Sequence, residues 1–400
     1  MLPRLRHDLD FFPSPIEDKP GLVMRDPFHF SDATLIIPPA LVACLEFFDG
    51  ERSELDLRAH LVRISGDVQA GELATHLLDT LSHAGFLLDG VFEQLKSNAE
   101  REFAESNVRE PSHAGSGYPE VASQLTEEFS GYMNGSTLAA GAKVRAIAAP
   151  HVSPFGGVEA YRAAYSALSK DDAARTFVVL GTSHYGAPDR IGLTRKSFRT
   201  PLGDTRTDLK IVEELASKMG AGALMEDYCH AVEHSIEFQV VFLQHLCGPS
   251  IRVVPILCGS YATSIYKGGL PEDSEDGKRI FGALGELAAR EGDRLLWVLG
   301  VDMAHIGRRY GDDLDAQADR GEMEKVARRD RRRIERMEAS DARGFWELVQ
   351  ENRDDLKWCG SAPIYTFLKA VPEARGELLH YQQWNIDEQS VVSFAGMRFT

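Results

Sequence analysis

Three histidines and one cysteine follow apolar segments of the sequence, at positions where a strand or a turn would end. They are His151, His184, His305 and Cys359. Neutral imidazoles and thiolates brought together from separate segments are common ligands of divalent transition metals. Two histidines and one thiolate would leave coordination positions free for water, oxygen or a substrate, as a catalytic metal centre requires. These residues predict a metal site and leave the identity of the metal open.

A carboxylate stands close to one of these histidines in the sequence. Asp302 precedes His305 by three residues, so a helical turn would point both side chains in the same direction. The carboxylate would then hold the imidazole ring and favour its protonated form. Because a histidine beside a carboxylate is suited to act as a general base near an open metal position, Asp302 and His305 are candidate catalytic residues.

Simpler interpretations compete with a metal site. A single histidine at a strand end is more often a surface residue, and a single cysteine is more often a small buried apolar one. His230 and His234 are four residues apart and could clamp a metal on a helix, but no HExxH motif accompanies them. We favour His234 as a residue of the pocket wall or a structural one, paired with Glu233. Ser183, also placed at the pocket, only loosely resembles the serine of a nucleophile elbow, and a strand-end turn is the favoured interpretation.

Apolar segments alternate with amphipathic ones from residue 143 onward. Strands are predicted at 144–149, 176–181, 252–257 and 295–300, and helices at 157–169, 209–219, 235–246 and 278–290. This alternation predicts an α/β fold whose central sheet is covered by helices on both faces. Residues 380–400 alternate polar and apolar side chains, which is typical of antiparallel strands, so a mixed sheet is expected. The candidate ligands stand beyond the carboxyl ends of the strands, where ligands of such sheets gather.

Two further features predict local structure. Pro255 lies inside the predicted strand 252–257, which indicates that this strand lies at an edge or has a bulge. Residues 328–336 are rich in arginine and predict a solvated helix face.

The residues before 109 predict a small domain and a linker. Within residues 1–90, strands are expected at 21–25 and 33–37, and helices at 41–48, 53–64 and 70–88, with Ser53 as a helix cap. Two strands and three helices predict a small α+β module of the winged-helix type, and the pattern is similar to that of small PqqD-like peptide-binding domains. Residues 91–108 are charged and form a solvated helix or linker, so the second domain spans residues 109–400.

The overall composition excludes several classes of protein. The chain has 400 residues and a formal net charge of -17, which disfavours binding to the phosphate backbone of nucleic acids. Its five cysteines are odd in number and far apart, which is typical of a reducing compartment and not of a disulfide framework. No apolar run approaches the roughly 20 residues that cross a bilayer, and no signal-peptide core follows the first residues. We therefore expect a cytoplasmic protein that binds neither membranes nor nucleic acids.

A series of motifs in the second domain resembles one protein family. Residues 109–118 are similar to R-x-A-S-H-A-G-S-W-Y, the opening of the Memo family, whose bacterial members are also called AmmeMemoRadiSam system protein B. Further motifs follow in the family's order: APH at 149–151, LGTSH at 180–184, RTPLGD at 199–204, EHSIE at 233–237, VVPILCG at 253–259, DMAH at 302–305, CGSAPI at 359–364 and Tyr381. The resemblance covers residues 109–400. It implies the fold of the class III extradiol dioxygenases, which hold a non-haem iron with two histidines and a carboxylate.

The resemblance also implies a role for each candidate residue. His151 and His184 match the two metal-binding histidines, and Cys359 matches the residue that takes the place of the carboxylate. His305 matches the base-like histidine, with Asp302 beside it. One divalent metal is implied, with iron favoured and copper or zinc as alternatives because a thiolate prefers softer metals. The implied substrate is a small molecule or a peptide, and the implied partners are radical SAM and AMMECR1-like proteins of the same system.

Two departures from the family's pattern lie where a substrate would enter. Gly117 replaces the tryptophan of the opening motif, and Val152-Ser153-Pro154 replaces the usual Ala-Gly-Tyr after the first histidine. The complete ligand set favours an enzyme, a mononuclear metal-dependent oxidoreductase related to the non-haem-iron dioxygenases. The thiolate and the altered pocket mouth favour the alternative, a non-catalytic peptide- or protein-binding module that uses the same cleft.

Overall fold

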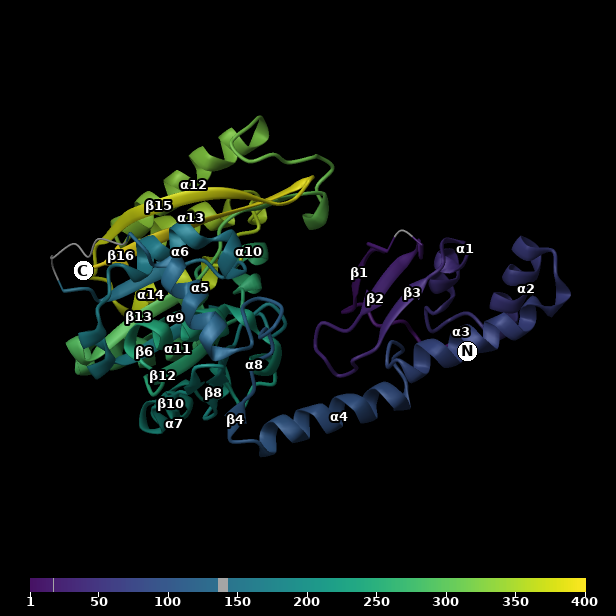
Figure 1. Ribbon diagram of the computed structural model, residues 1–400, viewed down its shortest axis with the longest axis horizontal. Coiled ribbons are helices and arrows are strands. Elements are labelled where there is room, and N and C mark those ends of the chain that lie inside the picture. Colours follow the sequence, from purple (N-terminus) through teal and green to yellow (C-terminus); the bar gives the residue numbers. More distant parts are fainter. Residues whose placement is uncertain (17, 136–142) are drawn as a thin grey trace. The chain divides into compact units, whose positions relative to one another are not determined.

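The chain folds into two compact units, Met1–Ser106 and Asn107–Thr400 (Figure 1). The computed structural model describes residues 1–16, 18–135 and 143–400. Each unit has a hydrophobic core of its own. Within the described part of the chain, no helix is both long and apolar enough to cross a bilayer.

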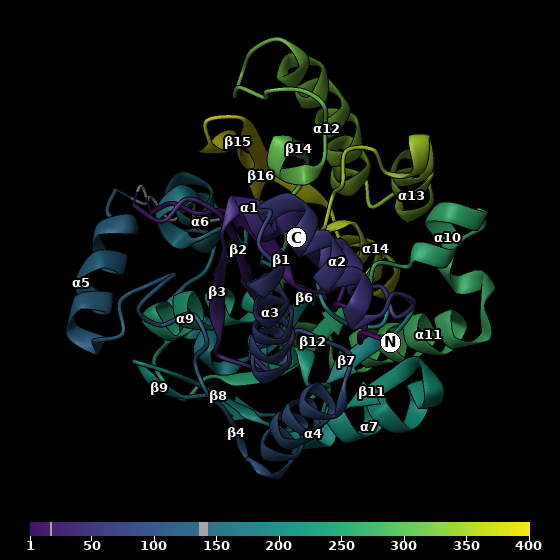
Figure 2. The same ribbon diagram turned by 90° about the vertical axis from the view of Figure 1, so that its right-hand side faces the viewer.

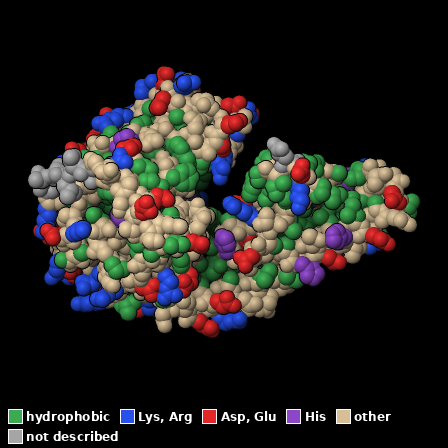
Figure 3. All heavy atoms as spheres, viewed as in Figure 1, with side chains coloured by type: hydrophobic (Ala, Val, Ile, Leu, Met, Phe, Trp, Pro, Cys, Tyr) green, Lys and Arg blue, Asp and Glu red, His purple; other side chains and the backbone are tan. Residues whose placement is uncertain are grey.

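The first unit consists of a small antiparallel sheet followed by helices. Its strands, in the order β1-β2-β3, are β1 (Asp10–Pro13), β2 (Leu22–Arg25) and β3 (Thr34–Ile37). Its helices are α1 (Pro39–Val42), α2 (Glu54–Ser65), α3 (Gly71–His83) and α4 (Gly90–Glu105). Strands occur at both predicted places, and β1 is additional. Hydrophobic side chains gather on the surface of this unit in Figure 3, and Phe11 of β1 is among the exposed ones.

A local hydrogen-bond pair explains one helix start in the first unit, and a contact distant in sequence holds another helix to the unit. Ser53 forms a capping box with Asp56 at the start of α2, which confirms the predicted serine cap. Helix α4 covers most of the segment predicted as a solvated helix or linker. Its first turn is tied to the unit because the buried Arg6 guanidinium lies 4.3 Å from the Phe92 ring and donates to Asp26.

Among the described residues, ten strands form one large sheet in the second unit (Figures 1 and 2). Its order is β11-β7-β12-β6-β13-β5-β16-β14, with β10 beside β12 and β15 beside β16. The strands are β5 (Ala146–Ala149), β6 (Thr176–Thr182), β7 (Ile191–Leu193), β10 (Arg206–Thr207), β11 (Ala223–Met225), β12 (Arg252–Cys258), β13 (Leu295–Gly300), β14 (His305–Gly307), β15 (Gly376–Asp387) and β16 (Ser390–Phe399). The pairs from β12 to β5 are parallel, whereas β16 is antiparallel to β5, β14 and β15. The predicted mixed sheet is confirmed.

Helices cover both faces of this sheet, as predicted. They are α5 (Ala122–Tyr132), α6 (Val158–Tyr165), α7 (Leu209–Met219), α8 (Cys229–Val232), α9 (His234–Cys247), α10 (Ala262–Lys267), α11 (Glu275–Glu291), α12 (Glu322–Glu338), α13 (Ala342–Gln350) and α14 (Ser361–Ala370). On β6, Phe177 and Val179 pack with α5, α6 and α9, whereas Val178 and Leu180 pack with α7, α11 and α14 on the other face. A small separate sheet contains β4 (Val108–Arg109), β8 (Ser197–Thr200) and β9 (Gly203–Asp204).

Pro255 marks neither an edge strand nor a bulge in the pairing with β6, so that prediction was wrong. Strand β12 lies inside the sheet and pairs with β6 along its whole length. On its other side it pairs with β10 at residues 252–253 and with β7 at residues 256–258. Pro255 falls in the interval between these two pairings, where a residue without an N–H group is tolerated.

The arginine-rich helix α12 is not solvated throughout, which corrects a second prediction. Asp330 is 0% exposed and Arg333 is 2% exposed, and both lie on the same buried face as Val326 and Ile334. Arg331 and Arg332 are on the outer face, where they pair with exposed glutamates. The density of charges along the segment conceals the spacing of three and four residues that marks its buried side.

The separate cores predict that the second unit folds alone. A chain of residues 107–400 is expected to be soluble and to melt in one cooperative transition, because its core residues lie within that range. Differential scanning calorimetry on this fragment and on the full chain checks the prediction. A fragment that aggregates while the full chain stays monomeric would show that the boundary or the independence is wrong.

Candidate metal centre

The candidate site lies beyond the carboxyl ends of adjacent parallel strands. His151 follows β5, and His184 follows β6; the strand between them, β13, leads to Asp302. Because all three strands run in the same direction, their ends meet at one edge of the sheet. Cys359 is brought to this edge by a hydrogen bond of 3.1 Å from the Thr182 hydroxyl group, at the end of β6, to its carbonyl oxygen.

Three imidazole rings form the centre of the site. His151, His184 and His234 each offer a ring nitrogen, and these atoms lie within 4.8 Å of one another. The ring centroids are 5.0–5.1 Å apart. This cluster could hold a metal ion. His234, predicted as a wall or structural residue, is therefore as close to the other two histidines as they are to each other, because it begins helix α9 directly above the sheet edge.

The Nδ1 atoms of two of these rings are occupied by hydrogen bonds, which leaves their Nε2 atoms available as metal ligands. His151 Nδ1 lies 2.9 Å from the Gly300 carbonyl oxygen, and His184 Nδ1 lies 3.0 Å from Glu233 Oε1. A carbonyl or carboxylate oxygen only accepts, so each Nδ1 carries the proton. Once deprotonated, each Nε2 presents its lone pair, which is the arrangement found in metal sites whose ligands are oriented by a second residue.

Glu233 contacts both His184 and His234. Its buried carboxylate accepts from the His184 amide at 2.9 Å and from the His234 amide at 3.0 Å, and it caps α9. Burial acts to raise the pKa of Glu233, but the adjacent His184 holds it well below its usual range. Burial likewise acts to lower the pKa of His184, and Glu233 raises it well above its usual range. The pairing of Glu233 with His234 was predicted, and the stronger one with His184 was not.

The Cys359 thiol adjoins the histidine cluster. Its Sγ atom lies 3.2 Å from His151 Nε2. Burial acts to raise the pKa of the Cys359 thiol, but His151 and His184 lower it below its usual value and so favour the thiolate. The structure thus brings the three predicted ligands, His151, His184 and Cys359, to one place.

Asp302 contacts His151 and not the ring of His305, contrary to expectation. Its Oδ1 atom accepts from the His151 amide at 2.8 Å, and its Oδ2 atom lies 3.5 Å from His151 Nε2. The predicted helical turn is absent from this described segment, since residues 301–304 are irregular and His305 begins β14. Burial raises the pKa of Asp302 to about 6.

Main-chain carbonyl groups hold the ring of His305. Its Nδ1 atom lies 2.9 Å from the Met303 oxygen and 3.1 Å from the Lys357 oxygen, which leaves Nε2 as the basic atom. The Tyr310 ring lies against it at 4.9 Å. Burial lowers the pKa of His305, although Asp302 acts in the opposite direction, so the expectation of a favoured protonated form was wrong.

Two residues considered from the sequence lie outside this donor set. The Ser183 hydroxyl is buried against Gly186 and has no hydrogen-bond partner in the described part of the chain. His230 directs Nε2 to the Gly192 carbonyl oxygen at 3.1 Å. The described cluster that could hold a metal ion contains His234 together with His151 and His184, and His230 is not a member of it.

A buried carboxylate that sequence reasoning left without a role ties the opening motif to the site. Glu237, on α9, accepts from Arg109, from the Tyr118 hydroxyl group and from the His113 amide at 3.0 Å. The His113 ring then lies 5.5 Å from that of His234. The sequence feature that could have indicated this role of Glu237 is the motif at 109–118, because its polar residues need a common buried partner.

Loss of the Glu237 charge should destabilise the protein in a pH-dependent way. Burial acts to raise the pKa of Glu237, but Arg109 and His113 hold it well below its usual range. Its stabilising effect is therefore complete above the unfolded pKa of about 4.3 and is lost as the pH falls through the lower folded value. Glu237→Gln should cost about 3–5 kcal/mol at pH 7, since Arg109 loses its buried partner.

Thermal melts between pH 3 and 7 check this, with Glu213→Gln as the matched control because Glu213 pairs with Arg195 at the exposed surface. The Glu213 variant should melt close to the wild type throughout. Equal melting temperatures of the Glu237 variant and the wild type at pH 7 would contradict the prediction.

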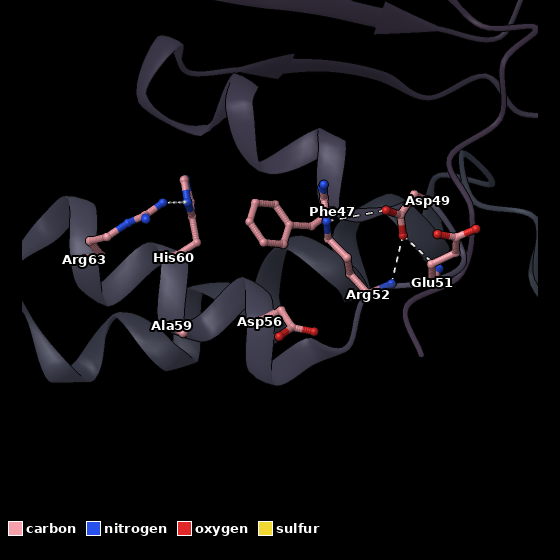
Figure 4. A pocket seen from close by; sticks show the side chains of 8 residues that line it. All are labelled: Phe47, Asp49, Glu51, Arg52, Asp56, Ala59, His60 and Arg63. Atoms are coloured by element: carbon pink, nitrogen blue, oxygen red, sulfur yellow. Dashed lines mark hydrogen bonds and ion pairs between the residues drawn. The ribbon is translucent and has the colours of Figure 1, made fainter.

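The first unit has a surface hollow of its own (Figure 4). It has a volume of about 620 Å³ and is lined by Phe47, Asp49, Glu51, Arg52, Asp56, Ala59, His60 and Arg63. Arg52 lies over the Phe47 ring at 4.9 Å and 3.5 Å from Asp49, and Arg63 contacts His60 at 2.9 Å. The histidine cluster that could hold a metal ion lies instead in the second unit.

The sheet and the histidine cluster define an α/β protein with a candidate metal centre at the carboxyl ends of its strands. The model of the family described as Memo-like protein matches residues 109–398. The chain belongs to the Memo family, which confirms the resemblance seen in its motifs.

Relatives within the family differ in how much of the chain they match. A MEMO1 family protein of Aquifex aeolicus is 29% identical over 404 residues, which cover 100% of this chain and 100% of its own length. A MEMO1 family protein of Thermococcus kodakarensis is 32% identical over 307 residues, which cover 73% of this chain and 99% of its own. A MEMO1 family protein of Pyrococcus abyssi is 29% identical over 287 residues, which cover 68% of this chain and 92% of its own length. The Aquifex protein thus aligns with both units, whereas the Thermococcus protein has no aligned counterpart to part of this chain.

Proposed function

We propose that the protein binds one divalent metal ion through His151, His184 and Cys359 and acts as a metal-dependent oxidoreductase related to the non-haem-iron dioxygenases. The observation that carries the proposal is the convergence of two Nε2 atoms and one Sγ atom, with the Nδ1 atom of each histidine bonded away from the site. Such pre-oriented donors are costly to bury without a ligand that uses them.

The donor set fits a first-row transition metal. Metal–nitrogen bonds of about 2.1 Å and a metal–sulfur bond of about 2.3 Å would place donors roughly 3.3–3.7 Å apart in a tetrahedral site. The separation of 3.2 Å between Cys359 Sγ and His151 Nε2 is close to this range. Iron is the metal that the family resemblance favours, and the thiolate keeps copper and zinc as alternatives. His234 is the competing third ligand, because its ring nitrogen belongs to the same cluster.

The residues around the donors would supply the remaining functions. A bound metal would provide Lewis-acid or redox chemistry at the open coordination positions. His305 would act as the general base through Nε2, since Met303 and Lys357 hold the opposite side of its ring. Asp302 would hold the backbone at His151, and Glu233 would fix the tautomer of His184.

We propose a small molecule or a peptide as the substrate, and radical SAM and AMMECR1-like proteins as partners, in a cytoplasmic setting. These assignments rest on the motifs shared with the family and on the composition of the chain.

Metal analysis of anaerobically purified protein is the direct test of the proposal. We expect about one transition-metal ion per chain, together with oxygen consumption on at least one member of a panel of catechols and small thiols. The fragment 107–400 should contain the same amount of metal. One metal per chain without turnover of any panel member would favour the alternative, a non-catalytic peptide- or protein-binding module. Protein that takes up no metal after reconstitution would refute the metal centre.

A further inference from the structure

Another buried carboxylate, that of Asp330, lies on helix α12. Asp330 is 0% exposed and accepts three hydrogen bonds. The Trp358 indole N–H donates to Oδ1 at 2.8 Å, and the hydroxyl groups of Tyr381 and Ser393 donate to Oδ2 at 2.8 and 2.6 Å. These three partners come from three different segments of the chain, so the carboxylate holds them together.

Two of the three partners adjoin candidate site residues. Trp358 directly precedes Cys359, so its indole fixes the start of the turn that carries the thiol. The Ser393 hydroxyl also accepts from the Ala304 amide at 2.8 Å, directly before His305. The Ser393 backbone completes this contact by donating to the Ala304 oxygen at 2.9 Å. The Asp330 carboxylate is thus connected through Trp358 to the residue before Cys359, and through Ser393 to the residue before His305.

The surroundings favour a fixed position for the indole. Trp358 is buried, and the Arg333 guanidinium lies over its ring at 5.0 Å while it pairs with Asp354 at 2.9 Å. The three hydrogen-bond donors to Asp330 are neutral, and together with the nearby Arg333 charge they offset the burial of the carboxylate. A core built only for stability would be served equally well by apolar side chains at these positions.

We propose that Asp330 is a positioning residue that holds the Cys359 turn, through Trp358, against the segment that leads to His305. It touches no reacting atom and acts only through its neighbours. The inference rests on the proposed metal centre, because it assigns Asp330 a role in the geometry of that centre.

The test compares variants that remove one hydrogen bond to the same carboxylate. Trp358→Phe removes the bond that leads to Cys359, whereas Tyr381→Phe removes a bond that leads to neither loop. Trp346→Phe is the matched control for the lost indole, because Trp346 is also buried and donates to Ser264 at 2.7 Å. Asp330→Asn removes the charge itself.

Two measurements on each full-length variant report on the thiol. The first is cobalt(II) affinity, followed by the thiolate-to-cobalt charge-transfer band. The second is the alkylation rate of Cys359 by iodoacetamide in metal-free protein, resolved from the other cysteines by peptide mass spectrometry. We expect Asp330→Asn and Trp358→Phe to weaken cobalt binding about 10–100-fold, the usual effect of losing a group that orients a ligand. We expect them to slow alkylation about fivefold, as the thiol moves away from His151 and His184.

The controls decide between positioning and general stabilisation. Tyr381→Phe and Trp346→Phe should lower the melting temperature about as much as Trp358→Phe while leaving both thiol measurements within about twofold of wild type. The inference is overturned if the controls shift these measurements as much as Trp358→Phe, or if Trp358→Phe leaves both unchanged. Trp358→Phe carries the test if Asp330→Asn does not fold. Wild-type protein that binds no cobalt would refute the proposed metal centre, and the alkylation rates would still test the role of Asp330.

Discussion

Cys359→Ala is expected to abolish stoichiometric metal binding, from about one ion per chain to a small fraction of that. The variant removes one of three convergent donors and the only anionic one among them. Loss of a residue that merely orients a ligand weakens metal binding about 10–100-fold, so loss of a ligand should exceed that range. Equilibrium dialysis followed by plasma mass spectrometry measures the effect directly.

Parallel variants decide which residues complete the site. His151→Ala and His184→Ala should lose metal as fully as Cys359→Ala. His234→Ala should lose it only if His234, and not Cys359, is the third ligand, because both lie next to His151. His60→Ala is the control, since His60 lies in the first unit. Metal content of Cys359→Ala equal to that of wild type would remove the thiolate from the ligand set.

His305→Ala is expected to lower any activity of the loaded protein by roughly 10²–10⁴-fold while leaving its metal content near wild type. The reason is geometric: main-chain carbonyl groups fix Nδ1 of this ring, so its free Nε2 atom is available to take a proton. Metal analysis, a melting curve and one rate measurement on the same sample test the assignment.

The three measurements separate three roles for His305. A base would lose rate and keep metal. A ligand would lose metal as completely as His151→Ala does, which contradicts our assignment. A structural residue would lower the melting temperature while the activity per folded molecule stays at the wild-type level.

The main strands and helices of the second unit could be predicted because the apolar residues of each element show by their spacing which side is buried. The strand predicted at 295–300 matches β13, and the helix predicted at 209–219 matches α7, since each is a continuous or periodic apolar segment. The convergence of His151 and His184 follows from the parallel order of β5, β13 and β6, which an α/β alternation favours.

Other features depend on tertiary contacts that a local pattern does not contain. Asp302 is adjacent to His151 because the backbone after β13 is irregular, whereas sequence spacing suggested a helical turn. Pro255 occupies a central strand because two short strands share the side that it faces. His234 joins the cluster because Glu233, its helix cap, also binds His184.

The contacts that orient the site histidines differ in how well they tolerate mutation. The rings of His151 and His305 are held by the carbonyl oxygens of Gly300, Met303 and Lys357. A main-chain acceptor persists through any amino-acid replacement that leaves the backbone path unchanged. Gly300 does not tolerate such a replacement, because a Cβ atom there would collide with the Ser235 main-chain oxygen. The orientation of His184 depends instead on one side chain, Glu233, which a single nucleotide change can remove. Among the acceptors of the three Nδ1 atoms, the Glu233 carboxylate is thus the one that a side-chain replacement removes directly.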